Sequence, residues 1–154
     1  MSTASQQKET DSTTLRKVIV KTMNVSRSTD TVFEFFKNIK NMENGGILKD
    51  ITKGEDGWWK FRTPTGEAKL KLGRVQQELG VIDHVFVGNG LVWQVYVRIV
   101  PNQDGSTASW TFIRPDGLDD KQFEEQLAAF DIEIEGWKKA LESTFWITGG
   151  QIQQ

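Results

Sequence analysis

The stretch that decides the fold is DDKQFEEQLAAFDIEIEGWKKALESTF, residues 119–145. Its large apolar residues recur every three or four positions, which places them on one side of an α-helix. At about 1.5 Å per residue, about 27 residues make a helix roughly 40 Å long. A helix with so continuous an apolar side must lie against another layer, so we expect these residues to face a sheet: Phe123, Leu127, Phe130, Ile134, Trp137, Leu141 and Phe145.

The start of this helix carries its own signal. Asp119 and Gln122 are spaced as a capping box, and Leu118 and Phe123 are placed as a hydrophobic staple. Several acidic residues follow on the same helix, and we interpret them as solvated surface rather than as a paired catalytic set: Glu124, Glu125, Glu133 and Glu135.

The chain before this helix is a succession of strand-like segments separated by turn residues. Glycine, proline and asparagine mark turns at residues 54–57, 64–66, 88–90 and 101–105. Strands that follow one another without helices between them imply an antiparallel meander. We expect these strands at residues 47–53, 58–63, 67–72, 81–87, 91–100 and 107–114.

One further strand and two short helices precede the meander. The strand is expected at residues 15–25. Ser28, Thr29 and Asp30 are candidate N-caps for a helix whose apolar residues share one face. Gly45 and Gly46 end this region, after a short second helix at residues 41–44.

The last hairpin has a register that can be argued from its loop. With the loop centred on Gln103 and Asp104, one face of the hairpin is apolar and the other mostly polar, as in a sheet covered on one side. The apolar face carries Trp93, Val95, Val97, Ile99, Ala108, Trp110, Phe112 and Arg114, and it is extended by Trp59, Phe61, Leu70 and Leu72. The fold class is therefore α+β, a curved antiparallel sheet of seven strands wrapped around a long C-terminal helix.

Composition excludes several classes of protein. The 154 residues carry a net charge of −2 with no basic stripe, so a nucleic-acid-binding surface is not expected. There is no cysteine and one histidine, which leaves no disulfide and no zinc site. No segment reads as a signal peptide or membrane span, so we expect a cytoplasmic protein. Residues 15–146 are expected to form one domain, between a disordered N-terminal tail at 1–14 and a flexible C-terminal tail at 147–154.

The order of elements resembles the helix-grip superfamily, also called SRPBCC, START-like or birch-pollen-allergen-like. The motifs PTGEA (64–68), GVIDH (80–84), RIVPN (98–102) and TFIR (111–114) resemble a polyketide-cyclase-like bacterial branch of it. The superfamily includes polyketide cyclases and dehydratases, lipid-transfer domains and activators of the Hsp90 ATPase. The resemblance implies an elongated apolar cavity between sheet and helix.

Three polar residues are candidates for catalysis. His84 is the only side chain that titrates near neutrality without perturbation. Its neighbour Asp83 points to the opposite face of the strand, so only one of the two can face the cavity. Arg114 would steady negative charge on a ligand. The alternatives are a surface histidine, a structural hydrogen bond of Asp83 and an ion pair of Arg114.

The six tryptophans and nine phenylalanines supply candidate walls for a binding site. Our leading hypothesis is a binder of a small hydrophobic, aromatic or lipid-like molecule that needs no cofactor and no metal. The alternatives are a cyclase- or dehydratase-type enzyme and a protein-interaction module using an exposed Trp58 or Tyr96, and a homodimer is left open. The expected ligand-binding residues are Trp59, Phe61, Leu70, Trp93, Val95, Trp110, Phe112, Phe130, Ile134 and Trp137.

Overall fold

The computed structural model describes residues 15–143, so the two expected tails and Phe145 lie outside the described part of the chain. The first strand is followed by an α-helix and a 3-10 helix, η1; a second 3-10 turn, η2, interrupts the meander. The elements in order are β1 (Val18–Val25), α2 (Thr29–Lys37), η1 (Ile39–Gly45), β2 (Lys49–Lys53), β3 (Trp58–Thr63), β4 (Gly66–Gln76), η2 (Gln77–Leu79), β5 (Val81–Gly88), β6 (Leu91–Asn102), β7 (Gly105–Ile113) and α3 (Asp120–Glu142).

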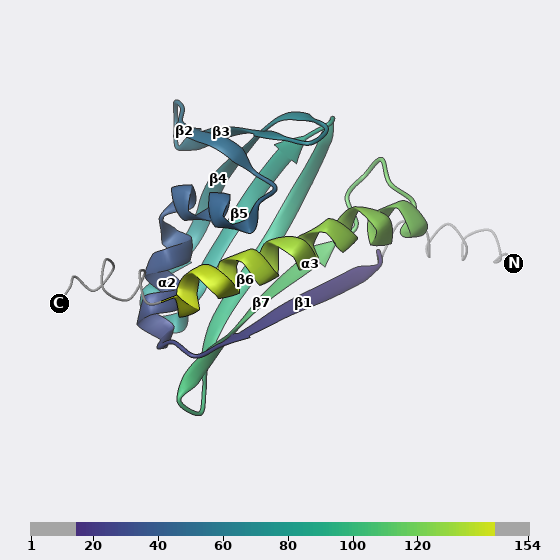
Figure 1. Ribbon diagram of the computed structural model, residues 1–154. Coiled ribbons are helices and arrows are strands. Elements are labelled where there is room, and N and C mark those ends of the chain that lie inside the picture. The colour runs from purple at the N-terminus through teal and green to yellow at the C-terminus, as the bar shows by residue number, and fades with distance from the viewer. Residues whose placement is uncertain (1–14, 144–154) are drawn as a thin grey trace, which may run out of the picture.

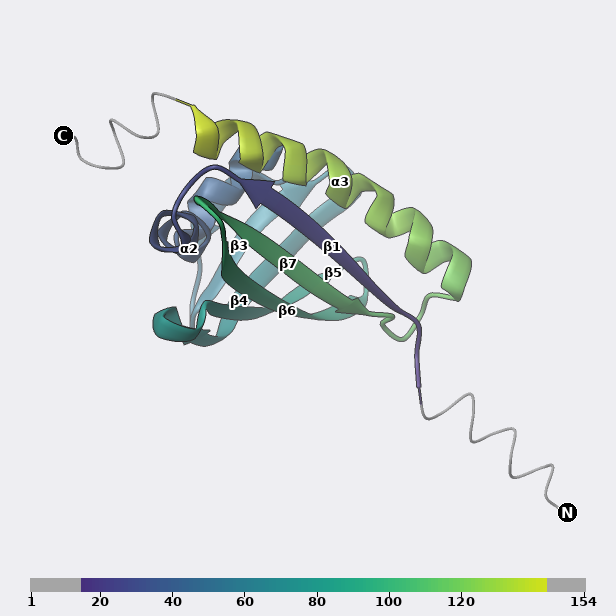
Figure 2. The same cartoon turned by 90° about the horizontal axis from the view of Figure 1, so that it is seen from below.

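All seven strands form one antiparallel sheet in the order β1-β7-β6-β5-β4-β3-β2. The sheet curves, and α3 crosses its concave side, as the two views in Figure 1 and Figure 2 show. The α2–η1 segment lies at the C-terminal end of α3 (Figure 1). This is the helix-grip α+β fold, so the predicted fold class is confirmed. Within residues 15–143, no helix combines the length and apolarity needed to cross a membrane.

The predicted register of the last hairpin is confirmed. Val97 pairs with Trp110 and Ile99 with Ala108, and the loop closes at Asn102 and Gly105. The alternation along β6 is strict, with Trp93, Val95, Val97 and Ile99 buried and their neighbours in the sequence exposed.

Strand β4 is longer than the sequence analysis predicted. Leu72 pairs with His84 but Val75 pairs with Ile82, so β4 carries one residue more than β5 over this stretch. Such a β-bulge lets a strand continue through a local irregularity. The strand expected to end at residue 72 therefore continues to Gln76.

The helix boundaries follow from their caps. Ser28 caps α2 by accepting a hydrogen bond from the Thr31 amide at 3.2 Å. The capping box of α3 is confirmed: Asp119 accepts from the Gln122 amide at 2.8 Å, and the Gln122 side chain accepts from the Asp119 amide at 2.9 Å. The predicted second short helix is η1, two residues longer at its start and one at its end.

The sheet and α3 are joined by a cluster of aromatic rings at the α2 end of the molecule. Trp110 of β7 stacks on Trp137 of α3 with centroids 5.5 Å apart, and Phe36 of α2 meets both rings edge-on at 5.4 and 5.2 Å. Phe130 completes the cluster, 5.3 Å from Trp110 and from Trp137. This part of the interior is filled.

The contact between α3 and η1 depends on glycine. A Cβ on Gly136 would collide with the Asn44 carbonyl, and a Cβ on Gly45 would lie 2.9 Å from Trp137 Nε1. The backbones can therefore approach closely. Trp137 Nε1 donates to the Met42 carbonyl at 3.1 Å, which fixes the helix against η1.

Candidate functional site

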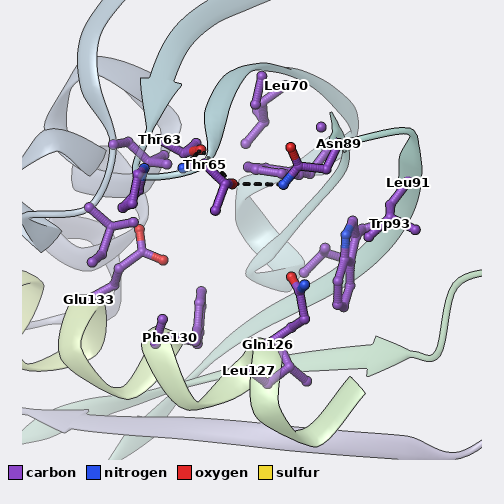
Figure 3. Close-up of a pocket in the computed structure, with 18 of the residues that line it drawn as sticks. Thr63, Thr65, Leu70, Asn89, Leu91, Trp93, Gln126, Leu127, Phe130 and Glu133 are labelled. Atoms are coloured by element: carbon purple, nitrogen blue, oxygen red, sulfur yellow. Dashed lines mark hydrogen bonds between the residues drawn. The ribbon is translucent and has the colours of Figure 1, made fainter. Parts of the chain in front are cut away.

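A cavity of about 360 Å³ lies between α3 and the strands β4, β5 and β6. Figure 3 shows it bounded by the middle turns of α3 on one side and by two hairpin turns on the other. It is partly open to solvent, and its lining is mostly apolar.

Strand pairing places the sheet wall of the cavity. Leu70 pairs with Phe86, and Phe86 pairs with Trp93, so these three side chains form a row across β4, β5 and β6. Because alternate residues of a strand share a face, Ala68 and Val95 lie on the same wall. The opposite wall is Leu127 and Phe130 of α3, and the end near η1 is closed by Met42, Ile47 and Leu48.

The rim of the cavity is polar. Asn89, in the β5–β6 turn, donates from Nδ2 to Thr65 Oγ1 in the β3–β4 turn at 2.7 Å (Figure 3). Asn89 and the following Gly90 both have positive φ, 53° and 75°, as a tight hairpin turn requires. Thr63 Oγ1 donates to the Gly66 carbonyl at 2.9 Å, which holds the other turn.

Glu133 is the polar residue that the sequence analysis missed. It was interpreted as solvated helix surface, and this interpretation is wrong, because only 9% of the residue is exposed and it lines the cavity. Within residues 15–143 its Oε2 atom has no hydrogen-bond partner. Burial raises the pKa of the Glu133 carboxyl to about 8. The signal was present: Glu133 lies three residues after Phe130 and four before Trp137, on the apolar side of α3.

His84 faces inward and lines the cavity together with Phe86. Desolvation lowers the pKa of the His84 imidazole to about 4, opposed by a hydrogen bond with the Ile82 backbone. The imidazole is therefore neutral near pH 7. It is half-buried by accessible area, since part of its surface borders the cavity.

Asp83 lies outside the cavity and has a structural contact. Its Oδ1 accepts a hydrogen bond from the Val97 amide at 3.0 Å, across from the β4 bulge. The carboxylate takes a position in the β5–β6 ladder where the strands lack regular pairing between Val81 and His84. Of the adjacent pair, it is therefore His84 that faces inward.

Arg114 also lies outside the cavity lining. Its Nη1 donates to the Leu118 carbonyl, and its Nε lies 3.0 Å from Asp120 Oδ1. Both contacts brace the loop that leads into α3. The three candidate catalytic residues are thus in three different environments, and the structure does not bring them together.

The expected ligand-binding residues divide into two groups. The cavity lining includes Leu70, Trp93, Val95, Phe112 and Phe130. The others pack in the hydrophobic core away from the cavity: Trp59, Phe61, Trp110, Ile134 and Trp137.

The neighbouring tryptophans of β3 point to opposite faces of the sheet. Trp59 pairs with the inward-facing Leu70, whereas Trp58 pairs with Lys71 on the convex face. Lys69 Nζ lies 4.4 Å from the centre of the Trp58 ring, so a cation–π contact covers part of this ring.

No arrangement for a metal ion is found in residues 15–143, where no group of three or more histidine or acidic side chains is suitably placed.

Several solved structures share the fold of this protein. No protein-family model and no curated protein matches the sequence. Among solved structures, the Aha1 dimer from Colwellia psychrerythraea matches with a TM-score of 0.65 and 14% identity, over 82% of this chain and 96% of that one. Ara h 8.0201 matches with a TM-score of 0.61 and 11% identity, over 81% and 97% of the two chains.

A third similar structure is DynU16, described as a putative protein in the dynemicin biosynthetic locus. It matches with a TM-score of 0.61 and 15% identity, over 82% of this chain and 47% of that one. At these identities the likeness shows the fold alone. That fold is the helix-grip fold, which the order of elements in the sequence predicted.

Proposed function

We propose that this protein binds a small, mostly apolar molecule in the cavity between α3 and the sheet. The observation that carries the proposal is an open, apolar-walled space of about 360 Å³ beside a part of the same interior that aromatic rings fill. Pockets for small organic molecules have volumes of about 300–1,000 Å³ and are lined in the same way, by apolar walls with a few polar groups.

The lining favours binding of an apolar body. Leu70, Phe86 and Trp93 offer a continuous wall on the sheet, and Leu127 and Phe130 face it from α3. Burial of apolar surface contributes about 25 cal/mol per Å². The polar rim at Thr63, Thr65 and Asn89 leaves the mouth compatible with solvent.

A matched pair of variants tests this proposal. Ala129 and Ala128 are neighbouring exposed alanines of α3, but only Ala129 lines the cavity. A neutral fluorescent probe, N-phenyl-1-naphthylamine, should bind the wild type with increased emission. Ala129→Phe should weaken this binding about tenfold or more by occupying the mouth, whereas Ala128→Phe should leave it unchanged.

Two results would contradict the proposal. One is a wild-type protein that produces no saturable change in probe emission. The other is an equal effect of the two substitutions, which would place the probe elsewhere on the surface.

A second candidate is supported by two groups in the same cavity. Of the three residues expected for a cyclase- or dehydratase-type enzyme, only His84 lines the space, and Glu133 joins it there. The Glu133 carboxyl, with a pKa of about 8, is suited to proton transfer near neutral pH, and the neutral His84 imidazole, a weak base with a pKa of about 4, offers a hydrogen bond beside it. Incubating the protein in deuterated water with an apolar ketone tests this: exchange of its α-protons that is lost in both His84→Gln and Glu133→Gln supports an enzyme, and no exchange contradicts it.

A further inference from the structure

The ionisable groups of the cavity lining are unbalanced in charge. They are Glu67 on β4, His84 on β5, and Glu125 and Glu133 on α3. Among the described residues, no lysine or arginine lines this space. His84 is neutral near pH 7 because its pKa is lowered to about 4. The lining therefore offers carboxyl groups and no protein cation to pair with them.

Glu133 is held in this lining by the contact between α3 and η1. A Cβ on Gly45 would lie 3.0 Å from Glu133 Cβ, so the η1 backbone is packed against the base of this side chain. The nearby hydrogen bond from Trp137 Nε1 to the Met42 carbonyl fixes the same turn of the helix. Figure 3 shows the carboxyl group projecting from α3 into the cavity. Because the backbone is fixed on one side, the carboxyl group is directed toward the ligand space.

The charged groups around this turn do not compensate Glu133. On η1, Lys40 Nζ donates to the Ile51 carbonyl at 3.2 Å, and Glu43 Oε2 accepts from the Ile51 amide at 2.8 Å. Both side chains are thereby committed to the β2 backbone. Glu133 Oε2 is left without a hydrogen-bond partner within residues 15–143, although buried polar atoms usually have one.

We propose that the cavity takes an apolar amine, with its ammonium group on the Glu133 carboxylate and its apolar body against Phe86 and Trp93. This inference rests on the proposed binding function and names the chemical class of the ligand. The ammonium would supply the missing partner of Oε2, and Glu67 and Glu125 add favourable negative potential. A carboxylate ligand would meet only like charge, since Arg114 lies elsewhere.

The proton balance of this binding is defined. Below pH 8 the free Glu133 carboxyl is protonated, because its pKa is about 8. An ammonium ligand then displaces that proton to solvent, and the ion pair forms between carboxylate and ammonium. Affinity for the amine should therefore rise with pH up to about 8. A neutral ligand that accepts a hydrogen bond from the protonated carboxyl would show the opposite trend.

The experiment compares three ligands that share a naphthyl group: 2-naphthylethylamine, 2-naphthylethanol and 2-naphthylacetate. Each is titrated into the full chain by calorimetry. Near pH 8.5 we expect the amine to bind about tenfold or more tightly than the alcohol, and the acetate to bind most weakly. The affinity of the amine should fall about tenfold per pH unit below the pKa of Glu133, with one proton released on binding.

Two conservative variants separate the cavity carboxyl from the rest of the helix. Glu133→Gln should abolish the preference for amine over alcohol and the proton release. Glu135→Gln, on an exposed position of the same helix outside the lining, should preserve both. The wild-type pH dependence provides a readout that does not depend on either variant folding.

The possible results are distinguishable. Equal binding of amine and alcohol by the wild type would overturn the amine proposal and leave cavity binding intact. Amine binding that weakens as pH rises from 6 to 8 would also overturn it. Failure of all three ligands to bind would reject both this proposal and the binding function.

Discussion

The long helix α3 closes two unlike spaces against one sheet. Toward its C-terminal end, Trp110, Phe130 and Trp137 meet at 5.3–5.5 Å and fill the interior. Nearer its start, beneath residues 125–133, the same sheet face leaves a cavity of about 360 Å³. We call these the packed half and the open half. Aromatic residues line both, so their number alone does not decide which space is filled.

The difference lies in what covers each half from the side. The packed half is bordered by α2, whose Phe36 packs edge-on against both Trp110 and Trp137. The open half is bordered by two hairpin turns, joined by the side-chain hydrogen bond of Asn89 and Thr65. Turns with small polar residues cannot supply the ring volume that α2 supplies. The cavity therefore exists where a covering helix is absent.

The largest effect should come from Trp137→Ala in the packed half. The indole is fully buried, and its removal leaves a void as well as a Met42 carbonyl without its donor. We expect a loss of about 3–5 kcal/mol in the free energy of unfolding, measured by urea denaturation.

Leu91→Ala is the matched change in the open half. Leu91 is partly exposed and lines a space that is already empty, so its truncation should cost about 1 kcal/mol. Similar losses for the two variants would remove the distinction between the halves.

The next effect should come from Gly136→Ala, at the boundary with η1. In an unobstructed helix this change stabilises by up to about 1 kcal/mol. Here the new Cβ would collide with the Asn44 carbonyl, so we expect destabilisation of about 1–3 kcal/mol. Thermal unfolding followed by circular dichroism measures it. A higher melting temperature for the variant would show that α3 and η1 are not in close contact.

The last effect is a pH dependence that arises in the open half and is spread over several pH units. The folded-state pKa of Glu133 is raised from 4.5 to about 8, so its contribution to stability is fully present below pH 4.5 and is lost as pH rises to 8. The pKa of His84 is lowered from 6.5 to about 4, so protonation in the unfolded state reduces stability as pH falls from 6.5 to 4. Between pH 4.5 and 6.5 the two contributions oppose each other.

Denaturation of variants across this range separates the two groups. Relative to Glu133→Gln, the wild type should lose stability with a slope of about 1.4 kcal/mol per pH unit between pH 4.5 and 8. Relative to His84→Gln, it should gain stability with a similar slope from pH 4 to 6.5. A flat difference in the first comparison would mean that Glu133 is solvated and that the open half is wetter than the structure indicates.

Much of the packed half could be predicted from the sequence. The spacing of the apolar residues indicated the helix that runs through both halves, and the loop position indicated the β6–β7 register that brings Val97 opposite Trp110. These features are local, or follow from the alternation of residues along paired strands. The cavity between sheet and helix was expected only from the resemblance to the superfamily.

The details of the open half required the structure. Trp93 and Trp110 share one face of the sheet, and periodicity does not reveal that only Trp93 borders a cavity. That depends on how closely η1 and α2 approach, which is a long-range contact. Glu133 was assigned to the surface from its charge, although its spacing from Phe130 and Trp137 indicated the apolar side. The charge of Glu133 predicts an exposed side chain and its spacing along the helix predicts a buried one, and the structure agrees with the spacing.

The glycine contact between α3 and η1 fixes the C-terminal part of the helix, so any rotation of α3 would take place about this contact. No side chain separates the two backbones at Gly136, so neither can move closer, and the Trp137 hydrogen bond resists separation. The start of the helix lies about 25 Å away along its axis, at about 1.5 Å per residue. Over that distance, a rotation of a rigid α3 by about 5° about the Gly136 contact would displace the first turn of the helix by about 2 Å. Such a rotation would have to carry the fully buried Phe123, whose ring stacks on Trp93 at 5.9 Å, so any change in the width of the cavity is coupled to that aromatic pair.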